Sequence, residues 1–213
     1  MNENANANER THQNKKNSNT SVRYMVQIGM LSAIAVILML FEIPLWFAPN
    51  FYKLDLSEVP VLIGTFAMGP IAGMLIELVK ILLNFIFDGT ITAGVGEVAN
   101  LIIGCALVVP AGIIYRYKKT RKSAIIALIA GTLVMAVVGS VLNAYILLPA
   151  YGRALDMPID ALVQMGTSVN ASITSLSTFV LFAVTPFNLL KGVVVSIVTM
   201  LLYKHISPIL HRK

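Results

Sequence analysis

Two long apolar runs flank a short basic run in the stretch that decides the fold. It reads VANLIIGCALVVPAGIIY over 98–115, RYKKTRK over 116–122 and SAIIALIAGTLVMAVVGSVLNAYILL over 123–148. A membrane-spanning helix needs about 20 predominantly apolar residues, and basic residues collect in the cytoplasmic loops between such helices. The stretch therefore predicts two membrane-spanning helices joined by a cytoplasmic loop.

The composition of the whole chain agrees with this interpretation. Of the 213 residues, 57% are hydrophobic and 12% are charged, whereas a soluble domain carries about 25% charged residues. Twelve of the 16 Lys and Arg lie in 1–23, in 116–122 or from Lys204 onward. Because these residues flank apolar runs instead of gathering on one folded surface, they indicate topology signals and no nucleic-acid partner.

Further apolar runs predict helices at 23–42, 56–68, 70–87 and 176–204. Gly69-Pro70 favours a break within 56–87, and Asp55 as N-cap with Glu58 three residues later predicts a helix start. One continuous span over 56–87 would place the basic loop outside the cell. A tight cytoplasmic turn at Gly69-Pro70 places it inside, with both termini. We therefore predict an all-α integral membrane protein with six transmembrane helices and both termini cytoplasmic.

The predicted organisation has three parts. Residues 1–20 form a disordered cytoplasmic tail without the apolar segment of a signal peptide, 21–207 the six-helix transmembrane substrate-binding domain, and 208–213 a cytoplasmic tail. The first outside loop, about 42–55, is aromatic, with Trp46, Phe47, Phe51 and Tyr52. The third, about 149–175, is polar and holds a candidate surface helix at 159–170.

No recognisable catalytic set is present. The chain lacks the Walker A, zinc-protease and nucleophile-elbow motifs, and its histidines are His12, His205 and His211, all in the predicted tails or close to them. Cys105 is the single cysteine and lies in an apolar run, where packing is the expected role. We predict no catalytic and no metal site, although an intramembrane enzyme with an unfamiliar motif stays open as an alternative.

Polar side chains inside the apolar runs are the candidate site. A charge at the bilayer centre costs about 2.5–3.5 kcal/mol on insertion scales, so such groups face the protein interior or a wet cavity. Glu77, Lys80 and Asn84 share one face of the helix 70–87. A structural Glu77–Lys80 ion pair and a ligand-lining role weigh about equally for them.

The last apolar run carries Thr185, Asn188 and Lys191, each three residues apart. Lys191 has no acidic neighbour on its own helix, which favours a ligand-lining role. Asn143 either contacts ligand or hydrogen-bonds between helices, and Glu97 either joins the site or stabilises a helix N-terminus. Such an amide-rich pocket with one or two charges, near an aromatic loop with Trp46, suits a flat heteroaromatic solute.

Three motifs carry a family resemblance: KLDLSEVP at 53–60, Gly69-Pro70, and PFNLLKG at 186–192. In this order they resemble the riboflavin-binding S components (RibU family) of energy-coupling-factor (ECF) vitamin transporters, over about residues 22–205. The resemblance implies a multi-pass subunit of the prokaryotic plasma membrane, in contact with membrane lipid, that captures riboflavin as transported ligand and needs no cofactor. It implies no ATP hydrolysis by this chain.

The resemblance also implies partners and site residues. The partners are a transmembrane T component and two cytoplasmic ATPase subunits. Asn188 and Lys191 would bind riboflavin, with Asn143 as a third contact and the first outside loop as gate. Docking would use small residues on the first helix, here Gly29, Ala33 and the adjacent Ala35. The alternatives are an S component for another small nutrient and a stand-alone carrier or channel.

Overall fold

The computed structural model describes residues 22–210 apart from 50–51, 91 and 155. The predicted tail 1–20, Phe51 and residues 211–213 lie outside the described residues. The predicted tail 208–213 begins within the last helix, which continues to Leu210.

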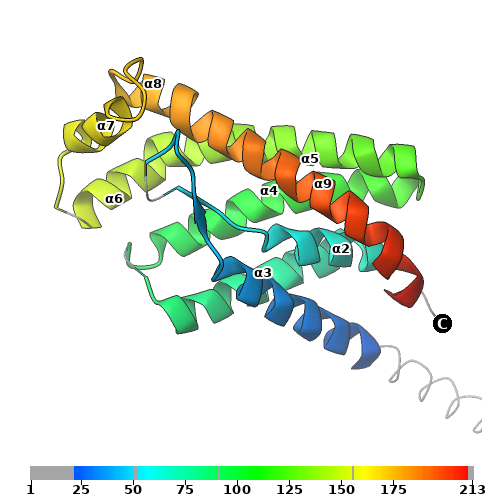
Figure 1. Cartoon of the computed structure of the whole chain (residues 1–213). Coiled ribbons are helices and arrows are strands. Elements are labelled where there is room, and N and C mark those ends of the chain that lie inside the picture. Colours follow the sequence, from blue (N-terminus) through cyan, green and yellow to red (C-terminus); the bar gives the residue numbers. More distant parts are fainter. Residues whose placement is uncertain (1–21, 50–51, 91, 155, 211–213) are drawn as a thin grey trace, which may run out of the picture.

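The described chain is a bundle of long helices with one small sheet (Figure 1). In chain order the elements are the first helix Val22–Met39, β1 (Ile43–Pro44), β2 (Lys53–Leu54), α2 (Glu58–Met68), α3 (Pro70–Asp88), α4 (Val95–Tyr117), α5 (Arg121–Leu142), the π-helical segment η1 (Asn143–Leu147), α6 (Leu148–Ala154), α7 (Ile159–Thr167), α8 (Leu176–Phe179), the π-helical segment η2 (Val180–Val184) and α9 (Thr185–Leu210). α5, η1 and α6 form one continuous helical stretch, as do α8, η2 and α9.

Five helical stretches in the described chain are long and apolar enough to cross a membrane. They are Val22–Met39, Pro70–Asp88, Val95–Tyr117, Arg121–Ala154 and Leu176–Tyr203. The all-α membrane class is confirmed. α2 is short, as predicted, with only 11 residues. Its residues Glu58–Phe66 are buried among α3, α4 and α9.

Gly69 and Pro70 make the predicted break between α2 and α3. Gly69 has φ +101°, in the left-handed region that favours glycine. Pro70 is the first residue of α3, where its missing N–H has no intrahelical partner to lose. The two helices therefore turn back on each other without a longer loop.

The predicted start of α2 is wrong in detail. α2 begins at Glu58 and Ser57 occupies the N-cap position, so Asp55 is not the cap. One carboxylate oxygen of Asp55 accepts a hydrogen bond from the Ser57 N–H at 2.8 Å. The other oxygen accepts a hydrogen bond from Lys191 of α9. This arrangement gives the ammonium group a charged partner, because a buried charge without a partner is costly.

The connections also differ from the expected loops. The first outside loop contains a two-residue antiparallel ladder in which Ile43 pairs with Leu54 and Pro44 with Lys53. The helix predicted over 123–148 continues to Ala154, which shortens the polar loop. Within that loop α7 forms as expected, and it buries Leu162, Val163 and Gly166.

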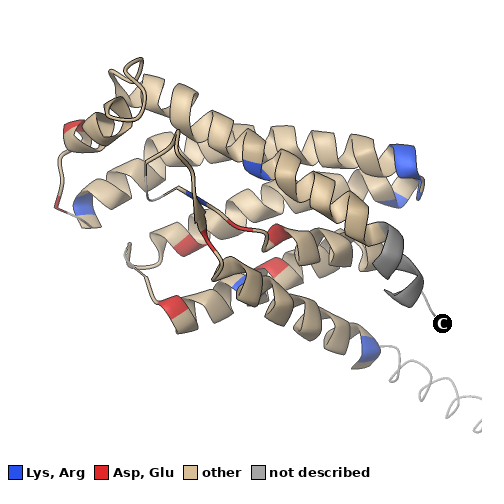
Figure 2. Ribbon diagram, viewed as in Figure 1, with Lys and Arg blue, Asp and Glu red and all other residues tan. Residues whose placement is uncertain are grey.

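In the described chain, charged residues lie at the ends of the apolar bundle and in its interior (Figure 2). The start of the first helix and the α4–α5 loop carry Lys and Arg at the same end of the bundle. Large apolar side chains such as Ile37, Phe87 and Val137 are more than half exposed on the outer faces. Such an exterior suits hydrocarbon, because lipid does not penalise exposed apolar surface.

Candidate substrate-binding site

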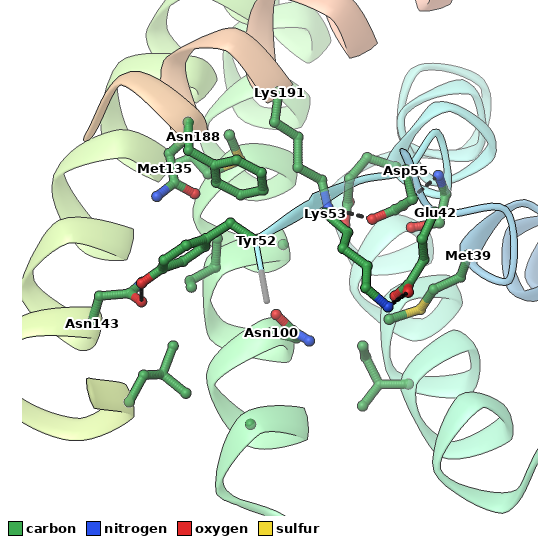
Figure 3. A pocket seen from close by; sticks show the side chains of 18 of the residues that line it. Met39, Glu42, Tyr52, Lys53, Asp55, Asn100, Met135, Asn143, Asn188 and Lys191 are labelled. Carbon is green, nitrogen blue, oxygen red and sulfur yellow. Dashed lines mark hydrogen bonds and ion pairs between the residues drawn. The ribbon is translucent and has the colours of Figure 1, made fainter. Parts of the chain in front are cut away.

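A polar cavity of about 180 Å³ lies between the outside loop and the helices α3, α4, α5 and α9 (Figure 3). Apolar side chains on its wall include Met39, Met135 and Phe187, and amides come from Asn100, Asn143 and Asn188. Charged side chains come from both the loop and the helices. They are Glu42, Lys53, Asp55, Glu58, Lys80 and Lys191.

Asn143 marks the end of the cavity nearest to η1, whose first residue it is. Its side-chain N–H donates to the Gly139 carbonyl at 2.8 Å, and its carbonyl oxygen accepts from the Tyr52 hydroxyl at 2.6 Å. Tyr52 comes from the outside loop and reaches across the cavity (Figure 3). Its ring packs on Phe187, with ring centroids 5.2 Å apart. The loop is therefore fastened to the helices at a candidate ligand contact.

Asn188 lies against α5 near Gly139, the residue that also accepts from Asn143. Its amide N–H donates to the Val184 carbonyl at 3.0 Å, and the side chain is buried. A Cβ at Gly139 would lie 2.9 Å from the Asn188 amide nitrogen. Because glycine at position 139 has no side chain, the Asn188 amide can pack against α5 beside the cavity.

Lys191 forms a partly buried ion pair with Asp55, with 2.7 Å between Nζ and Oδ2. Burial by itself would raise the pKa of Asp55, but Lys191 and then Lys80 outweigh it and lower the pKa to about 2. Asp55 is therefore ionised at neutral pH and holds Lys191 at the cavity wall. The sequence showed no partner for Lys191 on its own helix, and the structure supplies one from 136 positions away.

Lys80 connects two further carboxylates, one on the cavity wall and one outside the lining. Its Nζ lies 2.7 Å from Glu58 and 2.7 Å from Glu77, and all three side chains are almost completely buried. The predicted Glu77–Lys80 pair exists, but Glu58, considered only for a helix start, is a second partner. Glu77 does not line the cavity, whereas Lys80 and Glu58 do.

At the outer rim of the cavity, the loop is held by an exposed ion pair. Lys53, a residue of β2, forms an ion pair with Glu42, which directly precedes β1, and both side chains are about half exposed. The hydrogen bond from Lys53 to Glu42, together with the carboxylate charge, raises the pKa of Lys53. Because an exposed ion pair is weak, this contact can open at little cost.

Besides Glu77, three predicted site residues lie away from the cavity lining. Asn84 is half-buried, about one turn beyond Lys80 on α3. Glu97 accepts a hydrogen bond from Thr90 at 3.0 Å in the neighbouring loop. Trp46 is 89% exposed and packs edge-on against Phe47. Asn100, one helical turn from Glu97, is exposed and does line the cavity, although it was not among the predicted site residues.

The proposed docking residues divide between two faces of the first helix. Gly29 and Ala33 are exposed, and a Cβ at Gly29 would meet nothing within 4 Å. Ala35 is completely buried in the main core cluster. The 100° rotation per residue of an α-helix separates Ala35 from the exposed pair, so Ala35 does not belong to an exposed docking face.

A bundle of long apolar helices around a charged, amide-lined cavity defines a multi-pass membrane protein with a small-solute site. Residues 23–203 match the family model described as "ECF transporter, substrate-specific component". The chain therefore belongs to this family. It is a binding subunit for transport and not an enzyme. The family implies two kinds of partner, which are the substrate and the remaining subunits of the transporter, called the ECF module.

Relatives of this chain cover nearly its whole described length. The riboflavin transporter RibU of Staphylococcus aureus (strain TCH60) is 38% identical over 88% of this chain and 92% of that protein. The riboflavin transporter FmnP of Bacillus subtilis (strain 168) is 33% identical over 88% of this chain and 93% of its own length. A solved structure described as "Structure and mechanism of the S component of a bacterial ECF transporter" has 38% sequence identity and a TM-score of 0.70. It covers 90% of this chain and 99% of that one. These matches confirm the predicted family.

Proposed function

We propose that this chain binds riboflavin with high affinity in the cavity beneath the outside loop. As the substrate-binding subunit it passes the vitamin to a T component and two cytoplasmic ATPase subunits that drive uptake. One observation carries the assignment of the site. Asn143, Asn188 and Lys191, which come from two different helical stretches, line one cavity. The relatives named above are riboflavin transporters by name, which supports the choice of vitamin.

The chemistry of the lining fits this ligand. Riboflavin combines a flat tricyclic ring, whose edge carries carbonyl and N–H groups, with a polyhydroxylated chain. Phe187, Met135 and Leu147 offer apolar surface for ring faces, and Asn143 and Asn188 offer amide donors and acceptors for the ring edge. The Lys191 ammonium adds a charged donor, which makes a stronger hydrogen bond than a neutral one.

The outside loop is the proposed gate. The cavity of about 180 Å³ is smaller than the roughly 300–1,000 Å³ of typical small-molecule sites. Tyr52 occupies part of the space and satisfies the Asn143 carbonyl oxygen. Opening would release Tyr52 from Asn143 and Lys53 from Glu42, and riboflavin donors would then take the place of the Tyr52 hydroxyl.

We further propose the six-span topology, with a transmembrane domain at 21–207 between the cytoplasmic tails 1–20 and 208–213. The short helix α2 counts as a span because its neighbours shelter it. A cysteine at position 119 would test this after Cys105 is replaced by Ser. We expect an impermeant maleimide to label position 119 in disrupted cells and to leave it unlabelled in intact cells. Labelling in intact cells would show that position 119 lies outside the cell, which contradicts the proposed topology.

Fluorescence tests the ligand directly. Trp46 is the single tryptophan, and flavins absorb where tryptophan emits. We expect riboflavin to quench the emission saturably, with thiamine and ATP as ligands that leave it unchanged. Absence of saturable quenching in folded protein would exclude riboflavin and favour an S component for another nutrient. Accumulation of riboflavin in cells that lack the partner subunits would instead favour a stand-alone carrier.

A further inference from the structure

An apolar groove runs along the outer surface between α5 and α9, separate from the substrate cavity. Its volume is about 520 Å³. Its walls are made by side chains that are about half exposed, such as Ile125 and Ile129 from α5 and Val193 and Ile197 from α9. None of these residues lines the substrate cavity. α5, which forms one wall of the groove, lies at the opposite edge of the bundle from the first helix (Figure 1).

The groove opens where the two helices separate. At its inner end the helices pack closely, because a Cβ at Gly192 would lie 2.5 Å from the Thr132 side chain. From there α9 diverges from α5 toward the end of the bundle that carries the α4–α5 loop (Figure 1). The hydroxyls of Thr132 and Ser196 lie 3.5 Å apart and face each other. These two hydroxyls are therefore paired, and the surface between them and the open end suits a hydrocarbon chain.

The length of the groove matches one leaflet of a bilayer. Its lining extends from Arg121 to Leu133 on α5 and from Leu189 to Leu201 on α9. Twelve residues at 1.5 Å each rise about 18 Å. One leaflet of a hydrocarbon core that is 30 Å thick measures about 15 Å. An acyl chain that enters at the α4–α5 loop would fill the groove to the bilayer centre.

Charge at the mouth of the groove specifies the head group. Arg121 is the charged residue of the lining and is the first residue of α5, next to the α4–α5 loop. The adjoining α4–α5 loop adds Lys118 and Lys119, the second residue of α5 is Lys122, and residues 118–122 contain no Asp or Glu. No ion pair to Arg121 is found within the described part of the chain. A guanidinium group in this position can bind a phosphodiester through two parallel N–H donors.

We propose that the α5–α9 groove is a binding site for one anionic phospholipid. Its acyl chain lies between Ile129 and Val193, and its phosphate contacts Arg121. Zwitterionic lipids share the phosphate but lack the net charge that a cluster of basic residues attracts. The site depends on the membrane location of the chain and is independent of the riboflavin assignment.

Native mass spectrometry of the full chain in detergent, with dioleoyl phosphatidylglycerol or dioleoyl phosphatidylcholine added, tests the charge. We expect wild-type protein to retain more phosphatidylglycerol than phosphatidylcholine. Arg121→Gln should lower the affinity for phosphatidylglycerol about fivefold, which corresponds to ~1 kcal/mol per basic residue near a membrane surface. Lys118→Gln is the matched comparison, because it removes one charge of the basic cluster without touching the groove. It should lower the affinity for phosphatidylglycerol less than Arg121→Gln does.

A second pair of variants tests the groove itself. Val193→Phe fills it and should reduce the retention of both lipids. Val137→Phe adds the same bulk to an exposed position on α5 outside the groove and should leave retention unchanged. Thermal melting verifies folding for all variants. The proposal is overturned if wild type shows no preference for phosphatidylglycerol, or if Arg121→Gln and Lys118→Gln behave alike. It is also overturned if Val193→Phe retains lipid but no longer assembles with the ECF module, which would assign the groove to a protein partner.

Discussion

Lys191 combines two roles at the scale of single residues, because it pairs with Asp55 and also lines the cavity. We expect Lys191→Met to weaken riboflavin binding about 10- to 150-fold. This range corresponds to the ~1.5–3 kcal/mol of a hydrogen bond from a charged donor. Titration of the tryptophan quenching measures the change. Lys118→Met, outside the cavity, should bind as wild type does.

The double variant Asp55→Asn, Lys191→Met separates these two roles of Lys191. Lys191→Met alone leaves the Asp55 carboxylate buried without its partner, which lowers stability as well as affinity. Removing both charges should recover much of the lost Tm but not the lost affinity. If the double variant binds riboflavin as tightly as wild type, Lys191 only neutralises Asp55 and the donor to the ligand lies elsewhere.

Lys80 is expected to matter mainly for stability. Lys80→Met would leave Glu58 and Glu77 buried without a cation, and breaking a buried pair in this way costs ~3–5 kcal/mol. We expect a large drop in Tm in detergent without riboflavin. Lys53→Met breaks the exposed pair with Glu42 and should cost less than ~1 kcal/mol. Equal drops in Tm for the two variants would contradict a structural role for the buried cluster.

At the scale of elements, the contact between α5 and α9 places the amides. Glycine at position 139 lets Asn188 lie against α5, and the π-helical segments η1 and η2 contact each other just beyond it. Asn143 begins η1, and Thr185 follows η2 and bonds to Ser140 at 2.7 Å. A π-helical segment within an α-helix shifts the direction of the side chains that follow it, and such segments recur at functional sites.

Gly139→Ala tests this contact. The added methyl group would lie 2.9 Å from the Asn188 amide nitrogen, so the amide must move. We expect riboflavin affinity to fall at least about tenfold, as the loss of one well-placed hydrogen bond of ~1.5 kcal/mol implies. Gly29→Ala is the matched control, because its methyl group meets nothing within 4 Å. Unchanged affinity in Gly139→Ala would show that Asn188 does not contact the vitamin.

At the scale of the whole molecule, transport requires a surface that the binding site does not use. Gly29 and Ala33 are exposed on the first helix, where small residues permit close approach of another helix. We expect Gly29→Leu and Ala33→Leu to reduce uptake by cells that express the partner subunits, with little change in riboflavin binding. Ala154→Leu, an exposed position at the end of α6, should leave both intact. Equal loss of binding and uptake would place Gly29 and Ala33 in the internal packing instead.

Ala35→Leu extends the comparison to the buried face of the same helix. Ala35 is fully buried, and extra bulk in a packed core costs ~1–3 kcal/mol. This variant should lower the Tm and impair binding and uptake together. A wild-type Tm would show that the first helix can move away from the bundle.

The sequence by itself determined the features that depend on neighbouring residues. Apolar runs predicted the long helices, since lipid selects continuous hydrophobic stretches, and Gly69-Pro70 predicted the turn because these two residues have special backbone conformations. The motif around Asn188 and Lys191 indicated the family, which residues 23–203 confirm.

Only the tertiary structure decided which side chains meet. Lys191 pairs with Asp55, Lys80 with Glu58, and Tyr52 with Asn143, across 136, 22 and 91 positions of the chain. Such pairs depend on how each helix is rotated and packed against its neighbours, and local patterns do not specify this rotation. Trp46 and Asn84 therefore looked like pocket residues in the sequence but lie outside the cavity lining. Glu58 looked like part of a helix start, but packing makes it a partner of a buried lysine.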